Sequence, residues 1–295
     1  MSISYDVFVA DPIAQAVTEL VPNGDRRMFS PLSVTLIKGE RDAVLVDPPL
    51  TREQAADVAA WVKASGKNLT HIFATHGHGD HWFTAGLLAD TFGAQVVASA
   101  GTIAQMHRNV AMREVFWDKL FPDQIPDSPV TAVTPAGNRF ELEGHELRII
   151  EVGHSDTDET SVLHVPDLSL VVAGDVIYNG AHLYLSETWL AGLGAWRSAI
   201  DRVESLGARH IVAGHQNPEL DDDAARTIAG TREYLDVAEE LLRTETTAAG
   251  YFSAMAERYP DRLGRTVLWA TAQAVYAIRE HPGEDPAQFI AGGWL

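Results

Sequence analysis

The stretch His76-Gly77-His78-Gly79-Asp80-His81 places four metal-ligand side chains within six residues. It follows an apolar run at residues 72–75, which predicts a strand, and it precedes a segment from Trp82 that predicts a helix. In an extended segment, His76 and His78 would project their imidazoles to the same side, because they are two residues apart. Imidazoles and carboxylates at this spacing are typical ligands of a divalent metal ion. The stretch therefore predicts a metal-binding loop at the end of a strand.

Further ligand-type side chains recur at the ends of predicted strands. They are His154 after residues 146–152, Asp175 after residues 168–173 and His215 after residues 210–213. Loops that leave the ends of strands can converge on one face of a sheet scaffold, where sites are commonly built. We therefore expect these side chains to meet the residues of the His76–His81 stretch in one site.

Hydrophobic periodicity and turn signals predict a chain that mixes strands and helices. Strands are expected at residues 33–38, 43–46, 72–75, 95–99, 139–142, 146–152, 160–165, 168–173 and 210–213, and helices at 51–65, 82–92, 195–206, 223–246, 249–259 and 265–281. Thr51 is the expected N-cap of the first helix, and Gly66 follows its end. Residues 101–129 have a helical apolar pattern and a proline-rich end, which fits either a lid over a site or an ordinary packed insertion.

Composition limits the classes of partner. The chain has 295 residues, 46% of them hydrophobic, no cysteine, and a formal net charge of −19 with 22 Lys and Arg residues. Nucleic-acid binding is not expected, because it needs clustered cations. No stretch reaches the roughly 18 apolar residues of a membrane span, and the first residues lack the basic and apolar regions of a leader. We therefore expect a cytoplasmic protein that acts on a small-molecule substrate, away from membranes.

In order and spacing, the motif His76-x-His78-x-Asp80-His81 with the later His154, Asp175 and His215 resembles the metallo-β-lactamase superfamily, and in particular its glyoxalase II-like and lactonase-like hydrolases. The resemblance covers roughly residues 30–217. It implies an α/β fold, an αββα sandwich with its site at one edge of two sheets. We expect this catalytic domain at residues 1–218, followed by a helical C-terminal extension at residues 219–295.

The resemblance also implies a two-metal site. His76, His78 and His154 would hold the first metal, Asp80, His81 and His215 the second, and Asp175 would bridge them. These ligands favour two zinc ions, with iron, manganese or cobalt as alternatives. A hydroxide that bridges the ions would attack an electrophilic carbonyl, and Asp80 would orient it and shuttle a proton. Asp47 matches the acidic residue that supports the metal loop in this family, although Pro48-Pro49 follows it here.

Asp175 and Tyr178 indicate the class of carbonyl. Glyoxalase II-like thioesterases and N-acyl homoserine lactonases share Asp175, and the lactonases carry a tyrosine at the offset of Tyr178. A phenol there could donate to the developing oxyanion, or it could be a half-buried aromatic at a strand end. We predict a hydrolase of a small carboxylic ester, lactone or thioester, with lactones preferred. The alternatives are a β-lactam or other amide hydrolase and, from another class, a metal-bearing binding protein without turnover.

Two further residues are candidates for substrate contact. His182 follows Asp175 closely enough in sequence to reach substrate, and Trp82 either walls the pocket or begins the core of its helix. The helices after Pro218 lie outside the resemblance. They either pack on the sandwich, shape substrate access or form the contact of a homodimer.

Overall fold

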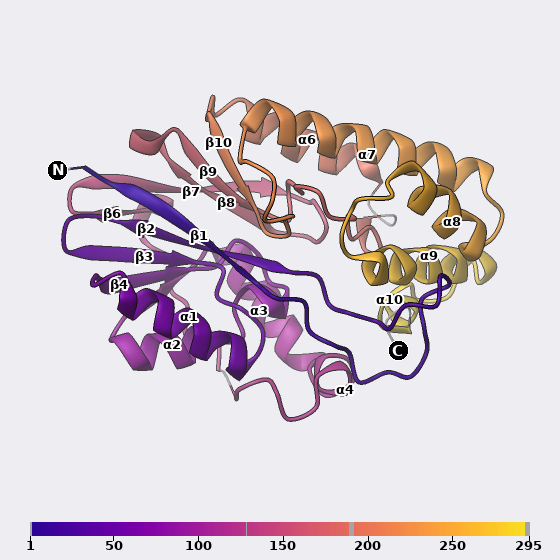
Figure 1. The fold of residues 1–295 in the computed structure, drawn as a ribbon, viewed down its shortest axis with the longest axis horizontal. Helices are drawn as coiled ribbons and strands as arrows, with labels where there is room; N and C mark the ends of the chain where they lie inside the picture. The colour runs from indigo at the N-terminus through magenta and orange to yellow at the C-terminus, as the bar shows by residue number, and fades with distance from the viewer. Residues whose placement is uncertain (1, 128, 189–191, 293–295) are drawn as a thin grey trace.

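Two five-stranded sheets stack face to face between layers of helices (Figure 1). The computed structural model describes residues 2–127, 129–188 and 192–292. The first sheet has the order β1 (Ser4–Ala10), β2 (Leu32–Lys38), β3 (Asp42–Val46), β4 (Asn68–Phe73) and β5 (Gln95–Val97). The second has the order β10 (His210–Ala213), β9 (Leu170–Gly174), β8 (Thr160–Val165), β7 (His145–Gly153) and β6 (Arg139–Leu142). The expected α/β fold with an αββα sandwich is confirmed.

Strand direction brings the predicted ligand positions to one edge. In the first sheet β3, β4 and β5 are parallel, so the loops after β3 and β4 leave the same edge. In the second sheet β10 is parallel to β9, and β7 has the same direction because β8 is antiparallel to both β7 and β9. The two edges meet where Ser161 N donates to Thr75 O at 2.9 Å and Ser33 N donates to Gly214 O at 2.7 Å.

Helices cover both outer faces of the sandwich. On the first sheet lie α1 (Arg52–Ala64) and α2 (Ala85–Phe92), with α3 (Ala100–Ala111) beyond them, and on the second lie α6 (Leu193–Glu204) and α7 (Ala224–Thr244) (Figure 1). The remaining helical segments are α4 (Trp117–Leu120), α8 (Ala248–Arg258), α9 (Arg265–Glu280), α10 (Ala287–Gly292) and the 3-10 turns η1 (Gly79–His81), η2 (Ala136–Asn138) and η3 (Pro166–Leu168). Thr51 caps α1 as expected, with Gln54 completing a capping box.

Three apolar clusters fill the spaces between these layers. The central one joins the facing sides of the sheets, with Phe73 and Val46 packed against the group of Leu163 and Val172. The other two fill the gaps between each sheet and its helices. Strand residues are therefore buried on both faces, which explains why β9 is apolar along its whole length and why every residue of β8 is buried.

The C-terminal helices pack on the sandwich and share its core. Leu235 of α7 and Leu268 of α9 belong to the same apolar cluster as Val171 of β9 and Ile211 of β10. The domain boundary at residue 218 stays a prediction. Ser128 of the expected lid segment and residues 293–295 of the expected extension lie outside the described residues. Among the helices that are described, none is long and apolar enough to cross a membrane.

The sequence prediction differs from the structure at several points. β1 is not among the expected strands, and β4 runs from Asn68 to Phe73 instead of over residues 72–75. The strand expected at residues 95–99 ends at Val97, because Ser99 instead accepts a hydrogen bond from Thr102 N and caps α3. A helix that the sequence prediction lacks, α10, follows the turn at Pro282-Gly283 and packs on α9. Its pattern is too short for periodicity to reveal it.

Candidate metal centre

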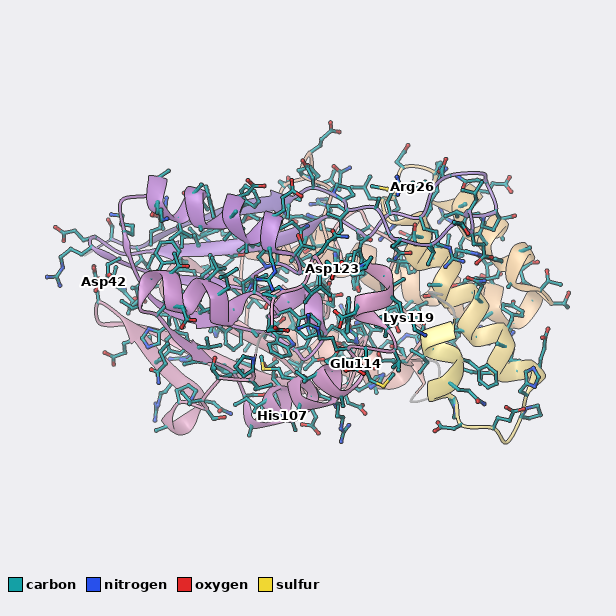
Figure 2. The ribbon with its side chains drawn as sticks, turned by 90° about the horizontal axis from the view of Figure 1, so that it is seen from below. Arg26, Asp42, His107, Glu114, Lys119 and Asp123 are labelled. Carbon is teal, nitrogen blue, oxygen red and sulfur yellow. The ribbon has the colours of Figure 1, made fainter. Side chains whose placement is uncertain are left out.

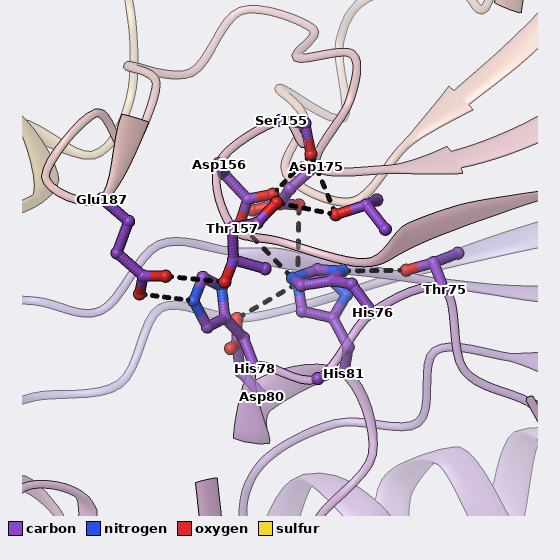
Figure 3. A network of polar contacts seen from close by, with 12 residues as sticks. Thr75, His76, His78, Asp80, His81, Ser155, Asp156, Thr157, Asp175 and Glu187 are labelled. Atoms are coloured by element: carbon purple, nitrogen blue, oxygen red, sulfur yellow. Dashed lines mark hydrogen bonds and ion pairs between the residues drawn. The ribbon is translucent and has the colours of Figure 1, made fainter. Parts of the chain in front are cut away.

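The loop after β4 forms the floor of the site. Its backbone packs closely on α3, since a Cβ on Gly77 would lie 2.3 Å from Gln105 Cβ. Glycine is therefore required there, and the loop can turn His76 and His78 toward the edge of the second sheet. The rings of these two histidines lie 5.0 Å apart at 80° (Figure 3).

One group of ligand atoms gathers around His81. Its Nε2 lies 3.3 Å from Asp80 Oδ2 and 3.4 Å from Asp175 Oδ1. The Nε2 of His215, at the end of β10, lies 3.4 Å from Asp80 Oδ2 and 3.4 Å from Asp175 Oδ2. Asp175 thus presents one oxygen to each imidazole, and the four residues are buried. This group contains the residues that the resemblance assigns to the second metal and to the bridge between the two metals.

A second group contains a residue that the sequence prediction missed. Asp156 Oδ2 lies 2.9 Å from His78 Nδ1 and 3.5 Å from His76 Nε2 (Figure 3). These three side chains are close enough together to hold one ion. His154, expected at this metal, lines the same pocket, and its Nδ1 contacts Asp158 Oδ1 at 2.6 Å. His154 does not join the close group among the residues that the structure describes.

Hydrogen bonds from the surrounding protein fix the orientation of the rings. His81 Nδ1 donates to Asp47 Oδ2 at 3.1 Å, and His78 Nε2 donates to Glu187 Oε1 at 3.0 Å, because carboxylates only accept. His215 Nδ1 donates to the carbonyl oxygen of Pro31 at 2.8 Å. Each ring therefore turns its other nitrogen toward the site, and that nitrogen has a lone pair when the ring is neutral. Such outer contacts are typical of metal-binding histidines.

The fourth histidine is oriented through a hydroxyl group. Thr75 Oγ1 donates to Asp47 Oδ2 at 2.8 Å, so this oxygen can accept from His76 Nδ1, which lies 3.0 Å away. Asp47 Oδ1 also accepts from Thr75 N at 2.8 Å. Asp47 thus holds the metal loop, the role that the resemblance implied for it.

Burial and charge shift the pKa values in the site strongly. Burial and the neighbouring His81 lower the pKa of His76 to about 3. Burial disfavours the charged form of His81, but the carboxylates of Asp80 and Asp175 hold its pKa well above its ordinary value. Burial also raises the pKa of Asp175. Burial opposes every charge in this site, and a charged carboxylate is stabilised only by positive charge beside it. A buried site of this kind favours a bound cation.

Unpartnered polar atoms test whether these residues fit a metal. Within the described residues, the buried site atoms without a hydrogen bond are His76 Nε2, His81 Nε2, His154 Nε2, Asp156 Oδ2 and Asp175 Oδ1. A buried polar atom without a partner is costly, so such a concentration requires an explanation. Bound cations supply one, because nitrogen and oxygen lone pairs are metal ligands. The donors are imidazole and carboxylate, which suit zinc, iron, manganese or cobalt.

A pocket of about 400 Å³ opens above these atoms. The predicted site residues that line it are His78, Asp80, His154, Asp175, Tyr178 and His215. Tyr178 donates its hydroxyl to Asp175 Oδ2 at 2.5 Å and stacks on His215 at 5.8 Å between ring centroids. The phenol is buried beside the ligand group and reaches the pocket wall.

The segment at residues 101–129 and the C-terminal extension each contribute a wall of the pocket. Met112 and Phe116 line it from the first, and Val267 and Ile290 from the second. Figure 2 shows the first wall extending toward the C-terminal helices, with the labelled His107, Glu114 and Lys119 upon it. The segment is also firmly packed, since Trp117 and Leu120 belong to the core.

Two residues expected to contact substrate lie elsewhere. Trp82 is buried beneath the metal loop, where its Nε1 donates to Gly77 O at 2.9 Å. His182 is buried against α7, with its Nδ1 3.0 Å from the hydroxyl of Tyr234. Neither is among the described residues that line the pocket. Sequence reasoning also missed Glu187, which lies in a loop without periodicity or a ligand spacing that would single it out.

Comparison with known proteins agrees with this geometry. The family model of the metallo-beta-lactamase superfamily matches residues 28–215, more than half of the chain. The chain is similar to the structure of a metallo-beta-lactamase from Pontibacter korlensis, with 19% identity, a TM-score of 0.57, and coverage of 80% of this chain and 99% of that one.

A second solved structure covers more of the chain. It is a metallo-beta-lactamase family protein from Thermus thermophilus, with 18% identity, a TM-score of 0.59, and coverage of 95% of this chain and 96% of that one. At such identities these likenesses show the fold, and the family model carries the assignment. The chain belongs to the metallo-beta-lactamase superfamily.

Proposed function

We propose that the protein is a dinuclear, zinc-dependent hydrolase of a small carboxylic ester, lactone or thioester. The observation that carries this proposal is the convergence of oriented imidazole lone pairs and buried carboxylate oxygens at the base of one pocket. A binding protein would not need two adjacent groups of ligands beneath a cavity large enough for a substrate. Members of this superfamily are mostly metal-dependent hydrolases, which supports the same reaction class.

The proposed ligands divide into two sets with a shared residue. His76, His78 and His154 would hold the first zinc, Asp80, His81 and His215 the second, and Asp175 would bridge them. Bound there, the ions would supply Lewis acidity and an activated water molecule. Zinc is the favoured metal because the donors are nitrogen and oxygen, and because a similar structure, a metallo-beta-lactamase from Pseudomonas aeruginosa, is described as a mono-zinc form.

The protein's own groups would orient the reaction. Asp80 Oδ2 lies between His81 and His215 and lines the pocket, so it could hold a water molecule by hydrogen bonding and accept its proton. Tyr178 could turn its hydroxyl from Asp175 Oδ2 to the substrate's carbonyl oxygen. A neutral phenol is suited to donate to a developing oxyanion, and burial beside Asp175 keeps the pKa of Tyr178 well above its ordinary value. This donor is the reason that we prefer a lactone.

A β-lactam is the second candidate substrate. Several of the similar solved structures are described as metallo-beta-lactamases, one of them after exposure to ceftazidime. Their identities of 17–19% support the fold more than the substrate. The same attack on a carbonyl would open an amide ring, so the two candidates differ in the leaving group and not in the site.

The test combines metal content with a panel of substrates. The purified chain would be assayed for bound metals by mass spectrometry, and for hydrolysis of acyl homoserine lactones, simple lactones, acyl thioesters, aryl esters and a chromogenic β-lactam. His76→Ala and Asp175→Ala should abolish turnover and leave the fold intact by circular dichroism. About two metals per chain with chelator-sensitive lactone or ester turnover would support the proposal.

Each other result has a definite meaning. Turnover of the β-lactam alone would favour the second candidate. Two metals without turnover of any substrate would favour a binding protein. A chain that binds no metal, even with added zinc, would refute the proposal, and so would full activity in either alanine variant.

A further inference from the structure

Asp156 is a buried carboxylate in the site that the superfamily motif does not account for. It lies in the loop between β7 and β8, two residues after His154, and its side chain is 0% exposed. Its Oδ1 accepts from Ser155 Oγ at 2.8 Å. Its Oδ2 has no hydrogen bond within the described residues, although His78 Nδ1 is 2.9 Å away. The carboxylate therefore lies at ion-pair distance from the imidazole, without the alignment of a hydrogen bond.

The protons on the neighbouring rings explain this arrangement. Glu187 Oε1 accepts from His78 Nε2, so a neutral His78 has its lone pair at Nδ1. Thr75 Oγ1 accepts from His76 Nδ1, so a neutral His76 has its lone pair at Nε2. Both lone pairs face Asp156 Oδ2, at 2.9 and 3.5 Å. With both rings neutral, these three electron-rich atoms would repel one another in a dry site, and a proton on His78 or a metal ion bound among them would relieve that repulsion.

The position that the family gives to His154 supports the same conclusion. His154 contacts Asp158 through Nδ1, and its Nε2 is buried without a hydrogen bond. It is nevertheless outside the close ligand groups of the described residues, whereas Asp156 completes one with His76 and His78. Asp156 is thus better placed to bind the first ion than the residue that the motif predicts.

We propose that Asp156 Oδ2 is a direct ligand of the first metal, beside His76 Nε2 and His78 Nδ1. This inference rests on the metal centre of the proposed function and adds a ligand to it. An extra carboxylate makes the first site more anionic and more oxygen-rich than three imidazoles would. It should therefore bind manganese or ferrous iron better, relative to zinc, than a site with nitrogen ligands alone.

The experiment measures metal binding rather than activity. The full chain, Asp156→Asn and Asp158→Asn would each be stripped, titrated with zinc, and assayed for stoichiometry and affinity by competition with a chelating dye. Asp158→Asn is the matched control, because it makes the same chemical change two residues away, on a carboxylate that touches only His154 in the site. Circular dichroism and melting curves would establish that each variant folds.

The two carboxylates should behave differently. Loss of a direct ligand should weaken the first metal by more than about 100-fold, whereas loss of an outer partner typically costs about 10–100-fold. Asp156→Asn should therefore bind one metal tightly where the unaltered chain binds two, and Asp158→Asn should keep both. With cobalt in place of zinc, the visible absorption of Asp156→Asn should lose the band of the first ion.

The outcomes separate this inference from the proposed function. If the unaltered chain binds two metals and Asp156→Asn binds both with no more than the roughly 100-fold loss of an outer partner, Asp156 is not a ligand and the hydrolase proposal stands. If Asp158→Asn loses more affinity than Asp156→Asn, His154 completes the first site instead. If the unaltered chain binds no metal, both proposals fail.

Discussion

Asp47 directly follows β3, and its Oδ2 accepts a hydrogen bond at 3.1 Å from His81 Nδ1 in the metal loop after β4. The same carboxylate accepts from Thr75 N and Thr75 Oγ1, each at 2.8 Å, and Thr75 in turn orients His76. One residue outside the ligand set therefore fixes a ring in each of the two ligand groups. Asp47 does so with a φ of 54°, a left-handed conformation that Asp and Asn tolerate better than most residues.

The first prediction concerns this support. Asp47→Asn keeps the backbone conformation and one acceptor oxygen, but it cannot satisfy both His81 and Thr75. We expect metal affinity to fall about 10–100-fold, the usual effect of losing an outer hydrogen bond to a ligand. Chelator competition would measure it. Asp42→Asn, on a partly exposed carboxylate at the other end of β3, is the control, and equal affinity in both variants would contradict the supporting role.

The second prediction concerns the phenol beside Asp175. Tyr178→Phe removes the only polar atom of that side chain, which donates to Asp175 Oδ2 at 2.5 Å and lies at the pocket wall. We expect kcat for a lactone to fall by up to about 100-fold, since a positioned oxyanion donor contributes that much or more, while metal content stays the same. Steady-state kinetics and mass spectrometry would measure the two quantities.

A buried tyrosine outside the pocket provides the control. Tyr234→Phe makes the same change at a hydroxyl that contacts His182. It should leave lactone turnover unchanged. An unchanged rate in Tyr178→Phe would remove the phenol from the reaction, and a parallel loss of metal would make it a support of Asp175.

The third prediction concerns stability at low pH. Burial, together with the positive charges of Arg262 and Arg265, lowers the pKa of His182 to about 3 from an ordinary value of 6.5. Below pH 6.5 the unfolded chain therefore binds a proton that the folded chain does not, and the free energy of unfolding falls as pH falls toward 3. Through His182, the free energy of unfolding decreases by at most about 1.4 kcal/mol per pH unit.

Urea unfolding of the metal-free protein between about pH 4.5 and 7.5, which spans the ordinary pKa of histidine, would measure this slope, with chelator present so that metal binding does not contribute. In His182→Asn, which cannot titrate, the slope should be smaller by up to the same amount, although its overall stability is lower. Equal slopes in the two proteins would show that His182 stays uncharged in the unfolded chain too, or is charged in both.

The ligands that the sequence predicted are those that directly follow a recognisable apolar strand. Asp175 and His215 each follow a short apolar strand, and parallel pairing of β9 and β10 brings the two ends together. The hydrophobic pattern and the helical crossover between the two strands determine strand direction, so the positions of both ligands could be inferred. The site residues with that signal therefore converge as expected.

Residues without such a signal could not be predicted. Glu187 meets His78 from a loop 109 positions away, and no periodicity fixes the path of that loop. Asp156 stands in a polar run after His154, where spacing alone does not show which carboxylate turns inward. Trp82 and His182 are close to ligands in sequence, but side-chain direction decides contact, and both point into the core. The C-terminal wall of the pocket depends on tertiary packing alone.

The last prediction concerns the apolar walls of the pocket. Met112 is 41% exposed and lines the pocket, whereas Val115 on the same segment is 48% exposed and does not. Neither residue belongs to the core clusters, so alanine at either position should leave the fold intact. Comparison of the two alanine variants therefore distinguishes a lost contact with substrate from a general effect on the segment.

An acyl chain that packs against Met112 would lose buried area in Met112→Ala. Each buried CH₂ group contributes about 0.8 kcal/mol. Losing the contact of only part of the Met112 side chain should therefore lower kcat/KM for a long-chain acyl ester about fivefold. An acetyl ester has almost no acyl chain to pack against this wall, so we expect its kcat/KM to be unchanged, and Val115→Ala should change neither. Kinetics with a series of esters from acetyl to decanoyl would measure the dependence on length. A uniform loss across the series would mean that Met112 shapes the site itself, and no loss at any length would mean that the acyl group lies along the other wall, at Val267 and Ile290.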